Sequence, residues 1–238
     1  MKITYIGHSG FSVELEKKVL LFDYYRGELP KASGDKKWYV FVSHGHGDHY
    51  NRDVLKLREN GLDVTYIFSG DIMTGKKAQE QGILRMKAHE SRRVDDLSVH
   101  TLKSNDEGVA YLIRTEGKTI YHAGDLNWWH WEGEPEEDNR FMEVSYKKEI
   151  ASLEQEHMDV AFLVLDPRQE EQFFWGFDWF MRHTDTRFAV PMHMWEDYGT
   201  PGRLLELAVS EPYRDRICPV KEPGEVMVMD EGNGEAHE

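Results

Sequence analysis

The stretch that decides the fold is Val42-Ser43-His44-Gly45-His46-Gly47-Asp48-His49-Tyr50, which packs three histidines and one carboxylate into six residues. It follows an apolar run, residues 38–42, without a break. Neutral imidazoles and carboxylates are ligands that zinc, iron and manganese accept, and the two glycines let the backbone curl so that neighbouring side chains converge. The pattern predicts a protein that binds metal, with two ions expected, and that uses them on a bound water.

The spacing divides the cluster between two ions. Side chains two apart in an extended chain point the same way, so His44 and His46 can reach one ion together. Asp48 and His49 follow on the curled part of the loop and can face a second ion. The remaining ligands must therefore come from distant parts of the chain.

Two later segments supply such ligands where a strand becomes a loop, which is where a rigid scaffold usually positions chemistry. Thr119-Ile120-Tyr121-His122-Ala123-Gly124-Asp125 ends in a glycine and a carboxylate, and Ala189-Val190-Pro191-Met192-His193 ends in a histidine. We therefore expect Asp125 and His193 to join the histidine cluster in space.

The totals suit one globular domain over residues 1–238, because 39% of the residues are hydrophobic and 12% are aromatic. The net charge of −15 argues against a nucleic-acid partner, which would need a basic surface. The single cysteine, Cys218, favours a reducing compartment. With no signal-like or membrane-length apolar run in the sequence, we expect a cytoplasmic protein with no membrane partner. The oligomeric state, including a homo-oligomer, stays open.

Strand signals dominate the first half of the chain, and helical signals increase in the second half. The predicted strands are residues 3–6, 11–15, 19–23, 37–43, 63–69, 99–102, 108–115, 118–122, 159–165, 186–190 and 225–229. The predicted helices are residues 51–59, 143–157, 171–183 and 201–210. Residues 132–139 are expected to form an exposed acidic loop, and residues 230–238 a frayed acidic tail. This order favours two packed sheets with helices outside.

Taken in order, the motifs carry a family resemblance. H-x-H-x-D-H, then a strand ending in H-A-G-D, then a strand ending in P-M-H, resembles the metallo-β-lactamase superfamily. Ile6-Gly7-His8-Ser9-Gly10-Phe11 and Leu20-Leu21-Phe22-Asp23 are similar to its metal-dependent hydrolase branch, which includes ascorbate-6-phosphate lactonase-like proteins. The resemblance implies an α+β fold, a four-layer αββα sandwich with the metals at one end of the sheets.

The resemblance also implies six metal ligands: His44 and His46 on the first ion, Asp48, His49 and His193 on the second, and Asp125 bridging the two. A hydroxide between ions roughly 3.5–4 Å apart would be the nucleophile. Asp48 would orient this water or take its proton. The implied cofactor is a divalent metal, one or two ions per chain, with zinc expected and manganese or iron as alternatives.

One position departs from the family pattern. A further histidine usually precedes the hairpin and completes the first site, but this chain has Ser104 there. Serine is a poor ligand for zinc, so we expect the second ion to bind more tightly than the first. Asp106 is a candidate to compensate, and His122 and His130 are more distant alternatives.

The sequence offers six further candidates for the rim of the site or for substrate contacts: His8, Asp106, His122, Trp128, Trp129 and Arg168. His8 fits a ligand-orienting contact and a local turn contact equally well. For the two tryptophans an apolar lid is favoured over ordinary core, and for Arg168 a salt bridge is favoured over an anion clamp. His122 fits a satisfied, half-buried histidine better than a ligand. Asp23 is expected in a turn or a helix cap.

Three classes of function stay open on these grounds. The leading expectation is a metal-dependent hydrolase that attacks a small, anionic metabolite such as a lactone, ester or phosphoester, and it rests on fold analogy. The alternatives are iron-dependent oxygen chemistry on the same scaffold and a non-catalytic metal-binding or sensor protein, which Ser104 favours.

Overall fold

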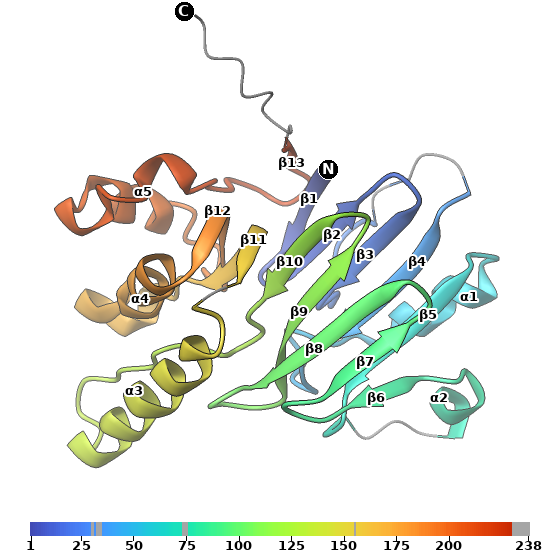
Figure 1. The fold of residues 1–238 in the computed structure, drawn as a ribbon, viewed down its shortest axis with the longest axis horizontal. Coiled ribbons are helices and arrows are strands. Elements are labelled where there is room, and N and C mark those ends of the chain that lie inside the picture. Colours follow the sequence, from blue (N-terminus) through green and yellow to red (C-terminus); the bar gives the residue numbers. More distant parts are fainter. Residues whose placement is uncertain (30, 32–34, 73–75, 155, 230–238) are drawn as a thin grey trace, which may run out of the picture.

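The computed structural model describes residues 1–29, 31, 35–72, 76–154 and 156–229, so the tail expected at 230–238 lies outside the described residues. Two β-sheets face each other, and helices cover their outer sides (Figure 1). This arrangement confirms the predicted αββα sandwich. No helix in the described part of the chain has the length and apolar character needed to cross a membrane.

Within the described residues, the first sheet has seven strands in the order β13-β1-β2-β3-β4-β5-β6. Their bounds are β1 (Lys2–Gly7), β2 (Gly10–Glu14), β3 (Lys18–Phe22), β4 (Lys37–Val42), β5 (Val64–Ser69), β6 (Leu84–Met86) and β13 (Val226–Val228). The strand pairs from β3 to β6 are parallel, whereas those from β13 to β3 are antiparallel.

The second sheet, again counted over the described residues, has six strands in the order β12-β11-β10-β9-β8-β7. Their bounds are β7 (Ser91–Val94), β8 (Leu97–Lys103), β9 (Val109–Thr115), β10 (Lys118–His122), β11 (His157–Val164) and β12 (Asp185–Met192). Strands β10, β11 and β12 are parallel. β12 is the last strand in this order, and an edge position accommodates Pro191, which has no N–H to donate to a neighbouring strand.

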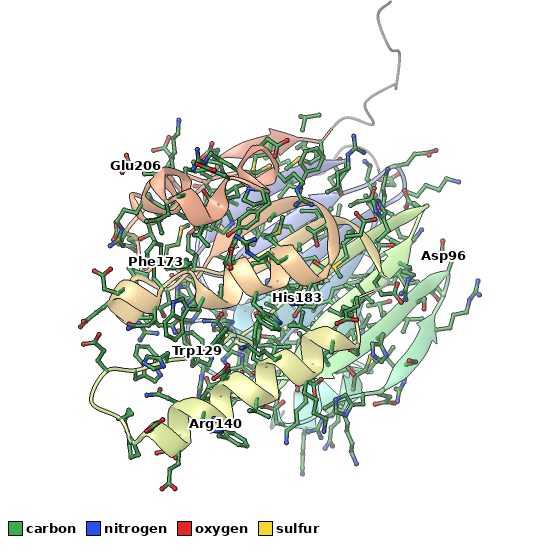
Figure 2. All side chains as sticks on the ribbon, turned by 60° about the vertical axis from the view of Figure 1, so that its left-hand side comes forward. Asp96, Trp129, Arg140, Phe173, His183 and Glu206 are labelled. Carbon is green, nitrogen blue, oxygen red and sulfur yellow. The ribbon has the colours of Figure 1, made fainter. Side chains whose placement is uncertain are left out.

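The helices lie on the outer sides of the sandwich. They are α1 (Lys56–Glu59), α2 (Lys76–Glu80), α3 (Glu136–Ala151), α4 (Trp175–His183) and α5 (Thr200–Glu206), with 3₁₀ turns η1 (Arg52–Leu55), η2 (Pro167–Gln172), η3 (Ala208–Ser210) and η4 (Arg214–Arg216). Helix α4 packs on β11 and β12. Figure 2 shows this helical side, with Arg140 on α3, His183 on α4 and Glu206 on α5.

Some predicted elements differ from the observed ones. Helix α3 begins at Glu136 rather than at residue 143, because Pro135 precedes it and three acidic residues in its first turn suit the helix dipole. Part of the expected acidic loop is therefore helical. The helix expected at 171–183 is divided into η2 and α4, and β6, β7 and α2 were not predicted.

Alternating residues of the first sheet bury both of its faces. In β3, Leu20 and Phe22 belong to the main core between the sheets, whereas Val19 and Leu21 belong to a second cluster on the outer face. η1 covers that outer face with Val54. Because both faces are buried, this strand has an apolar sequence rather than an alternating one.

The parallel strands bring the chemistry to one end of the sandwich. β4 ends directly before the histidine loop, 43–50, and β3 ends before Asp23. In the other sheet, β10, β11 and β12 end before Asp125, Asp166 and His193. Because parallel neighbours end at the same edge of a sheet, residues far apart in sequence meet there.

Candidate metal centre

Two histidines and two carboxylates surround a first position. Nε2 of His44 lies 3.0 Å from Nδ1 of His46 and 3.4 Å from Oδ2 of Asp125. His46, Asp106 and Asp125 form a group whose donor atoms all lie within 4.8 Å of one another. The structure thus brings Asp106 to the position where the sequence suggested that it could compensate for Ser104.

A second position is surrounded by the rest of the predicted ligands. Asp48, His49 and His193, together with His8, offer donor atoms that all lie within 4.8 Å of one another. Oδ1 of Asp125 lies 3.1 Å from Nε2 of His49 and 3.4 Å from Nε2 of His193. One oxygen of Asp125 therefore faces each position, which is the arrangement of a bridging carboxylate.

The donor atoms of this cluster are better placed to bind a shared cation than to form hydrogen bonds with one another. Nε2 of His8, Nε2 of His49 and Oδ1 of Asp125 are buried, yet none has a hydrogen-bond partner. Buried polar atoms are normally satisfied, so three unsatisfied atoms at one place require an explanation. Imidazoles and carboxylates together are the donor set of zinc, manganese and iron sites, and a shared divalent ion would satisfy all three atoms.

Asp23 fixes the histidine loop from inside the protein. Its side chain is 1% exposed and accepts hydrogen bonds from Ser43 N at 2.7 Å, Ser43 Oγ at 2.6 Å and His49 Nδ1 at 2.8 Å. The turn or cap role expected for Asp23 is wrong. A carboxylate that holds one ring nitrogen directs the other toward a metal, and Nε2 of His49 faces Asp125.

Asp166 supports His193 in the same way, and the sequence analysis did not find it. Its Oδ2 accepts hydrogen bonds from His193 Nδ1 at 3.0 Å and from Trp195 Nε1 at 3.2 Å. Arg168 donates through Nε to both oxygens of Asp166, and its guanidinium lies 4.4 Å from the Trp195 ring centroid. Arg168 is therefore engaged in a salt bridge, which agrees with the alternative to an anion clamp.

The electrostatics of the cluster favour a cation. Burial and the neighbouring His49 lower the pKa of His44 to about 4, so its imidazole is neutral, as a ligand must be. Burial opposes a charge on His49 as well, but Asp125 and Asp23 outweigh it and raise the pKa of His49 to about 10. Although burial opposes it, His49 and His193 hold the pKa of Asp125 well below its usual range. Two buried carboxylates thus concentrate negative potential beside these imidazoles.

Two glycines allow the sheets to approach at Ser43. Gly108 has a φ of +69°, and a Cβ there would lie 1.9 Å from the Ser43 carbonyl oxygen. Gly124, which precedes Asp125, has a φ of +53°, and its Cβ would lie 2.7 Å from Cβ of Ser43. The glycine of the H-A-G-D motif therefore lets the bridging carboxylate reach the histidine loop.

The tryptophans do not form the expected lid. Trp129 is buried, donates from Nε1 to the Asp125 carbonyl at 2.9 Å, and meets the His193 ring edge-on at 5.7 Å between centroids. Trp129 therefore packs against Asp125 and His193 from inside the protein. Trp128 instead packs against Trp175, with Nζ of Lys147 3.8 Å from its ring centroid.

His122 is a structural residue rather than a rim residue. It is fully buried, its ring stacks on Phe22, and Nε2 donates to the Ser9 carbonyl at 2.9 Å. Nδ1 accepts a hydrogen bond from Gly124 N at 3.1 Å. Because both ring nitrogens are satisfied, His122 offers no free donor to a metal, and the satisfied-histidine alternative fits.

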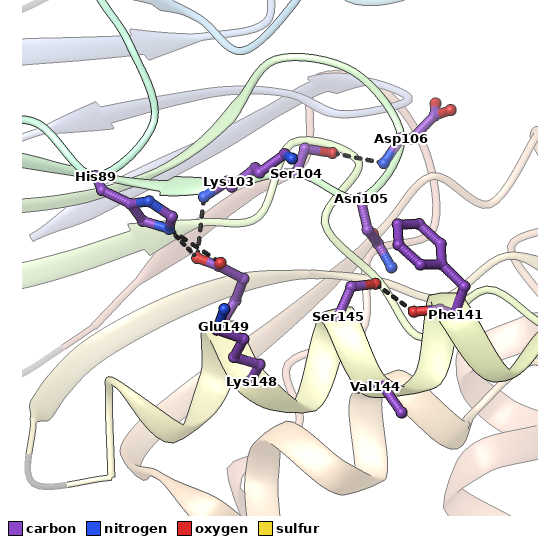
Figure 3. Close-up of a pocket in the computed structure, with 10 residues that line it drawn as sticks. All are labelled: His89, Lys103, Ser104, Asn105, Asp106, Phe141, Val144, Ser145, Lys148 and Glu149. Carbon is purple, nitrogen blue, oxygen red and sulfur yellow. Dashed lines mark hydrogen bonds and ion pairs between the residues drawn. The ribbon is translucent and has the colours of Figure 1, made fainter.

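Ser104, two residues before Asp106, lines a cavity of about 580 Å³ (Figure 3). The polar groups of this cavity pair with one another, since Glu149 accepts hydrogen bonds from His89 and from Lys103 N. Ser104 Oγ accepts one from Asp106 N at 3.2 Å, and Figure 3 shows the Asp106 carboxylate turned away from the cavity. The cavity therefore adjoins the metal centre without converging on it.

A smaller hollow of about 330 Å³ opens on the donor atoms themselves. Its lining residues are His8, Tyr25, Arg26, Asp48, Trp195 and Glu196. An ion pair between Arg26 and Glu196 crosses it. Because this hollow contains two members of the donor set, it is the better candidate for substrate access.

Comparisons with known sequences support a metal-dependent family. A family model described as a beta-lactamase superfamily domain matches residues 2–138. A metal-dependent hydrolase of Pelotomaculum thermopropionicum is 33% identical over 144 residues, and one of Desulforamulus reducens is 30% identical over 145 residues. Each match covers 52% of this chain and 62% of the relative. The chain thus spans less than two thirds of the length of these relatives.

Solved structures show the same fold at low sequence identity. A metallo hydrolase from the archaeon Ignicoccus hospitalis is 20% identical with a TM-score of 0.61, covering 95% of this chain and 97% of that one. A putative metal-dependent hydrolase from Parabacteroides distasonis is 15% identical with a TM-score of 0.63, covering 92% of both chains. A diiron beta-hydroxylase from Streptomyces venezuelae is 13% identical with a TM-score of 0.54, covering 81% of this chain and 44% of that one.

Proposed function

The chain belongs to the beta-lactamase superfamily, and from that premise we propose that it is a metal-dependent hydrolase of a small, anionic lactone, ester or phosphoester. The observation that carries the proposal is the placement of Asp125. One of its oxygens faces His44, and the other is buried, has no hydrogen-bond partner and lies between His49 and His193. A carboxylate placed in this way can bridge two ions.

The proposed ligands divide into two sets that share Asp125: His44, His46 and Asp106 for one ion, and Asp48, His49 and His193 for the other. Bound there, divalent metal would supply a hydroxide nucleophile at neutral pH and would polarise the substrate oxygen. Asp23 and Asp166 hold His49 and His193 by their Nδ1 atoms, so the Nε2 atoms keep their orientation.

Asp48 is the residue best placed to orient the attacking water. The neighbouring His8 imidazole and His49 hold its pKa well below the usual range, although partial burial opposes them, so it stays a carboxylate. Its side chain is 30% exposed, at the boundary between the donor cluster and the hollow. A carboxylate at this boundary can accept a hydrogen bond from an attacking water and so orient it.

The hollow favours a small substrate with an anionic group. Tyr25 and Trp195 give it aromatic walls, and Arg26 lines it with a guanidinium that an anionic substrate would have to take over from Glu196. A guanidinium suits the planar geometry of a carboxylate or phosphate. A chain with a net charge of −15 is a poor surface for a nucleic acid, which makes a small metabolite the better candidate.

The test begins with protein purified without added metal. We expect elemental analysis to find one or two divalent ions per chain, and a panel of lactones, esters and phosphoesters to include a substrate whose hydrolysis stops on chelation and returns with metal. Asp125→Asn should lose both metal and hydrolysis. Absence of bound metal would refute the proposal. Metal without turnover would favour a metal-binding or sensor protein, and bound iron with oxygen consumption would favour oxygen chemistry.

A further inference from the structure

His8 occupies a strained turn that places it beside a metal-centre histidine. It lies between β1 and β2 with a φ of +53°, a conformation that a residue with a side chain adopts only at a cost. Its carbonyl accepts a hydrogen bond from His193 N at 3.2 Å, and His193 has a φ of +64°. The two strained residues are thus joined through their backbones, with ring centroids 4.1 Å apart.

The His8 imidazole has an unsatisfied nitrogen that faces the second position. The side chain is 5% exposed, and Nε2 is buried without a hydrogen-bond partner. Oδ2 of Asp48 lies 3.4 Å from this nitrogen, but the pair does not have hydrogen-bond geometry. The positive φ follows from the hairpin, because His8 and Ser9 are the two central residues of the turn that pairs Gly7 with Gly10. The turn does not explain the buried nitrogen without a partner.

We propose that His8 is a fifth protein ligand of the ion at the second position, in addition to Asp48, His49, His193 and the shared Asp125. This inference rests on the proposed metal-binding function and adds to the six ligands that the family resemblance implies. His8, Asp48, His49 and His193 offer donor atoms that all lie within 4.8 Å of one another. His8 is not among the six ligands that the family resemblance implies. With Asp125 bridging, the second ion has a full set of protein donors.

A full donor set changes the expected behaviour of the two ions. Zinc sites with four protein ligands are closed, whereas sites that bind water or substrate keep a position open. The ion beside His8 should therefore exchange slowly. The first ion, where Ser104 replaces a histidine and the donors His46 and Asp106 are exposed, should exchange faster.

His8→Gly is a suitable variant because glycine adopts a positive φ without strain, so the imidazole is removed while the turn is kept. Free imidazole can then fill the vacant place. The matched control is His89→Gly. His89 also has a positive φ, +58°, and its exposed imidazole pairs with Glu149 and belongs to none of the donor groups found in the described residues. His8→Asn is a second variant, since asparagine tolerates the same backbone conformation.

The measurement is the release of Zn²⁺ to a chelator from the loaded protein, together with the visible spectrum of the Co²⁺-loaded protein. The wild type and His89→Gly should release their ions in a fast and a slow phase. Loss of an outer partner typically weakens a site about 10- to 100-fold, so loss of a ligand in His8→Gly should accelerate the slow phase by about 100-fold or more. Added imidazole should slow it again and restore the Co²⁺ spectrum.

Two outcomes would overturn the inference: a slow phase that is unchanged in both His8 variants, or a faster phase with an unchanged Co²⁺ spectrum and no response to imidazole. A wild-type protein that retains no metal would instead overturn the proposed function. The two failures are therefore distinguishable.

Discussion

Replacing Asp23 by asparagine should weaken both the fold and the metal centre. Oδ1 accepts a hydrogen bond from Ser43 N, and Oδ2 accepts from Ser43 Oγ and His49 Nδ1. An amide nitrogen cannot accept, so in either orientation of the asparagine at least one buried donor loses its partner. Hydrogen bonds to charged groups contribute about 1.5–3 kcal/mol each, and we expect the free energy of unfolding to fall by about that amount.

The effect on metal binding follows from His49. Asp23 holds Nδ1 of this ring and so leaves Nε2 to face Asp125. Removal of such an orienting carboxylate typically lowers metal affinity about 10- to 100-fold, which corresponds to about 1.4–2.8 kcal/mol. The Asp23→Asn variant should therefore bind Zn²⁺ about 10- to 100-fold more weakly than the wild type. Competition with a chromophoric chelator measures this difference.

The matched control is Asp159→Asn. Asp159 is also buried, and it accepts hydrogen bonds from Thr119 N at 2.9 Å and Lys118 Nζ at 3.3 Å, near the beginning of β11 and away from the centre. This variant should lose stability in denaturant titrations but keep its Zn²⁺ affinity. If Asp23→Asn also keeps its affinity while it loses stability, Asp23 has only a structural role and the reasoning is refuted.

Three further predictions concern the first ion, the glycine contact at Ser43 and the cysteine. Ser104→His should tighten the first ion about tenfold or more by adding an imidazole, whereas an unchanged metal titration would show that this position does not face the ion. Gly108→Ala should destabilise the fold by about 3 kcal/mol or more, because its Cβ would meet the Ser43 carbonyl. Gly202→Ala, in an uncrowded position on α5, should instead stabilise it by about 0.5–1 kcal/mol in the same denaturant titration. Burial raises the pKa of Cys218 to about 11, so a thiol reagent at pH 8 should meet about one thiolate in a thousand. The labelling rate of the native protein should rise about tenfold for each unit that the pH is raised. A native labelling rate equal to that of the unfolded protein would contradict the raised pKa.

The sequence predicts the sandwich and its metal-centre segments because these depend on short-range patterns. The H-x-H-x-D-H spacing is local, and the strands before it and before Asp125 and His193 are rich in β-branched and aromatic residues. Once three strands are assigned to a common edge, their terminal side chains must be neighbours. The structure accordingly brings all six predicted ligands into three overlapping donor groups, which share His49 and Asp125.

The supporting carboxylates could not be found in the same way. Asp23 and Asp166 follow strands β3 and β11, and their roles depend on which strand lies beside each one in the sheet. In sequence, Asp23 looks like any acidic residue in a turn, and Asp166 precedes a proline as a helix cap would. A useful rule emerges from this pair: a carboxylate that ends a parallel strand next to a histidine-bearing strand is a candidate partner of that histidine.

The erroneous predictions have a common physical origin. The Trp128-Trp129 pair follows Asp125 directly, but proximity in sequence does not say which side of the ligand a side chain takes, and Trp129 packs inward against His193. His8 presents the opposite case. Its turn is remote in sequence from every predicted ligand, yet a backbone hydrogen bond to His193 carries it into the cluster. Contacts across the sandwich, which no local pattern encodes, therefore decide how many donors each ion has, and with them which ion keeps a place for water.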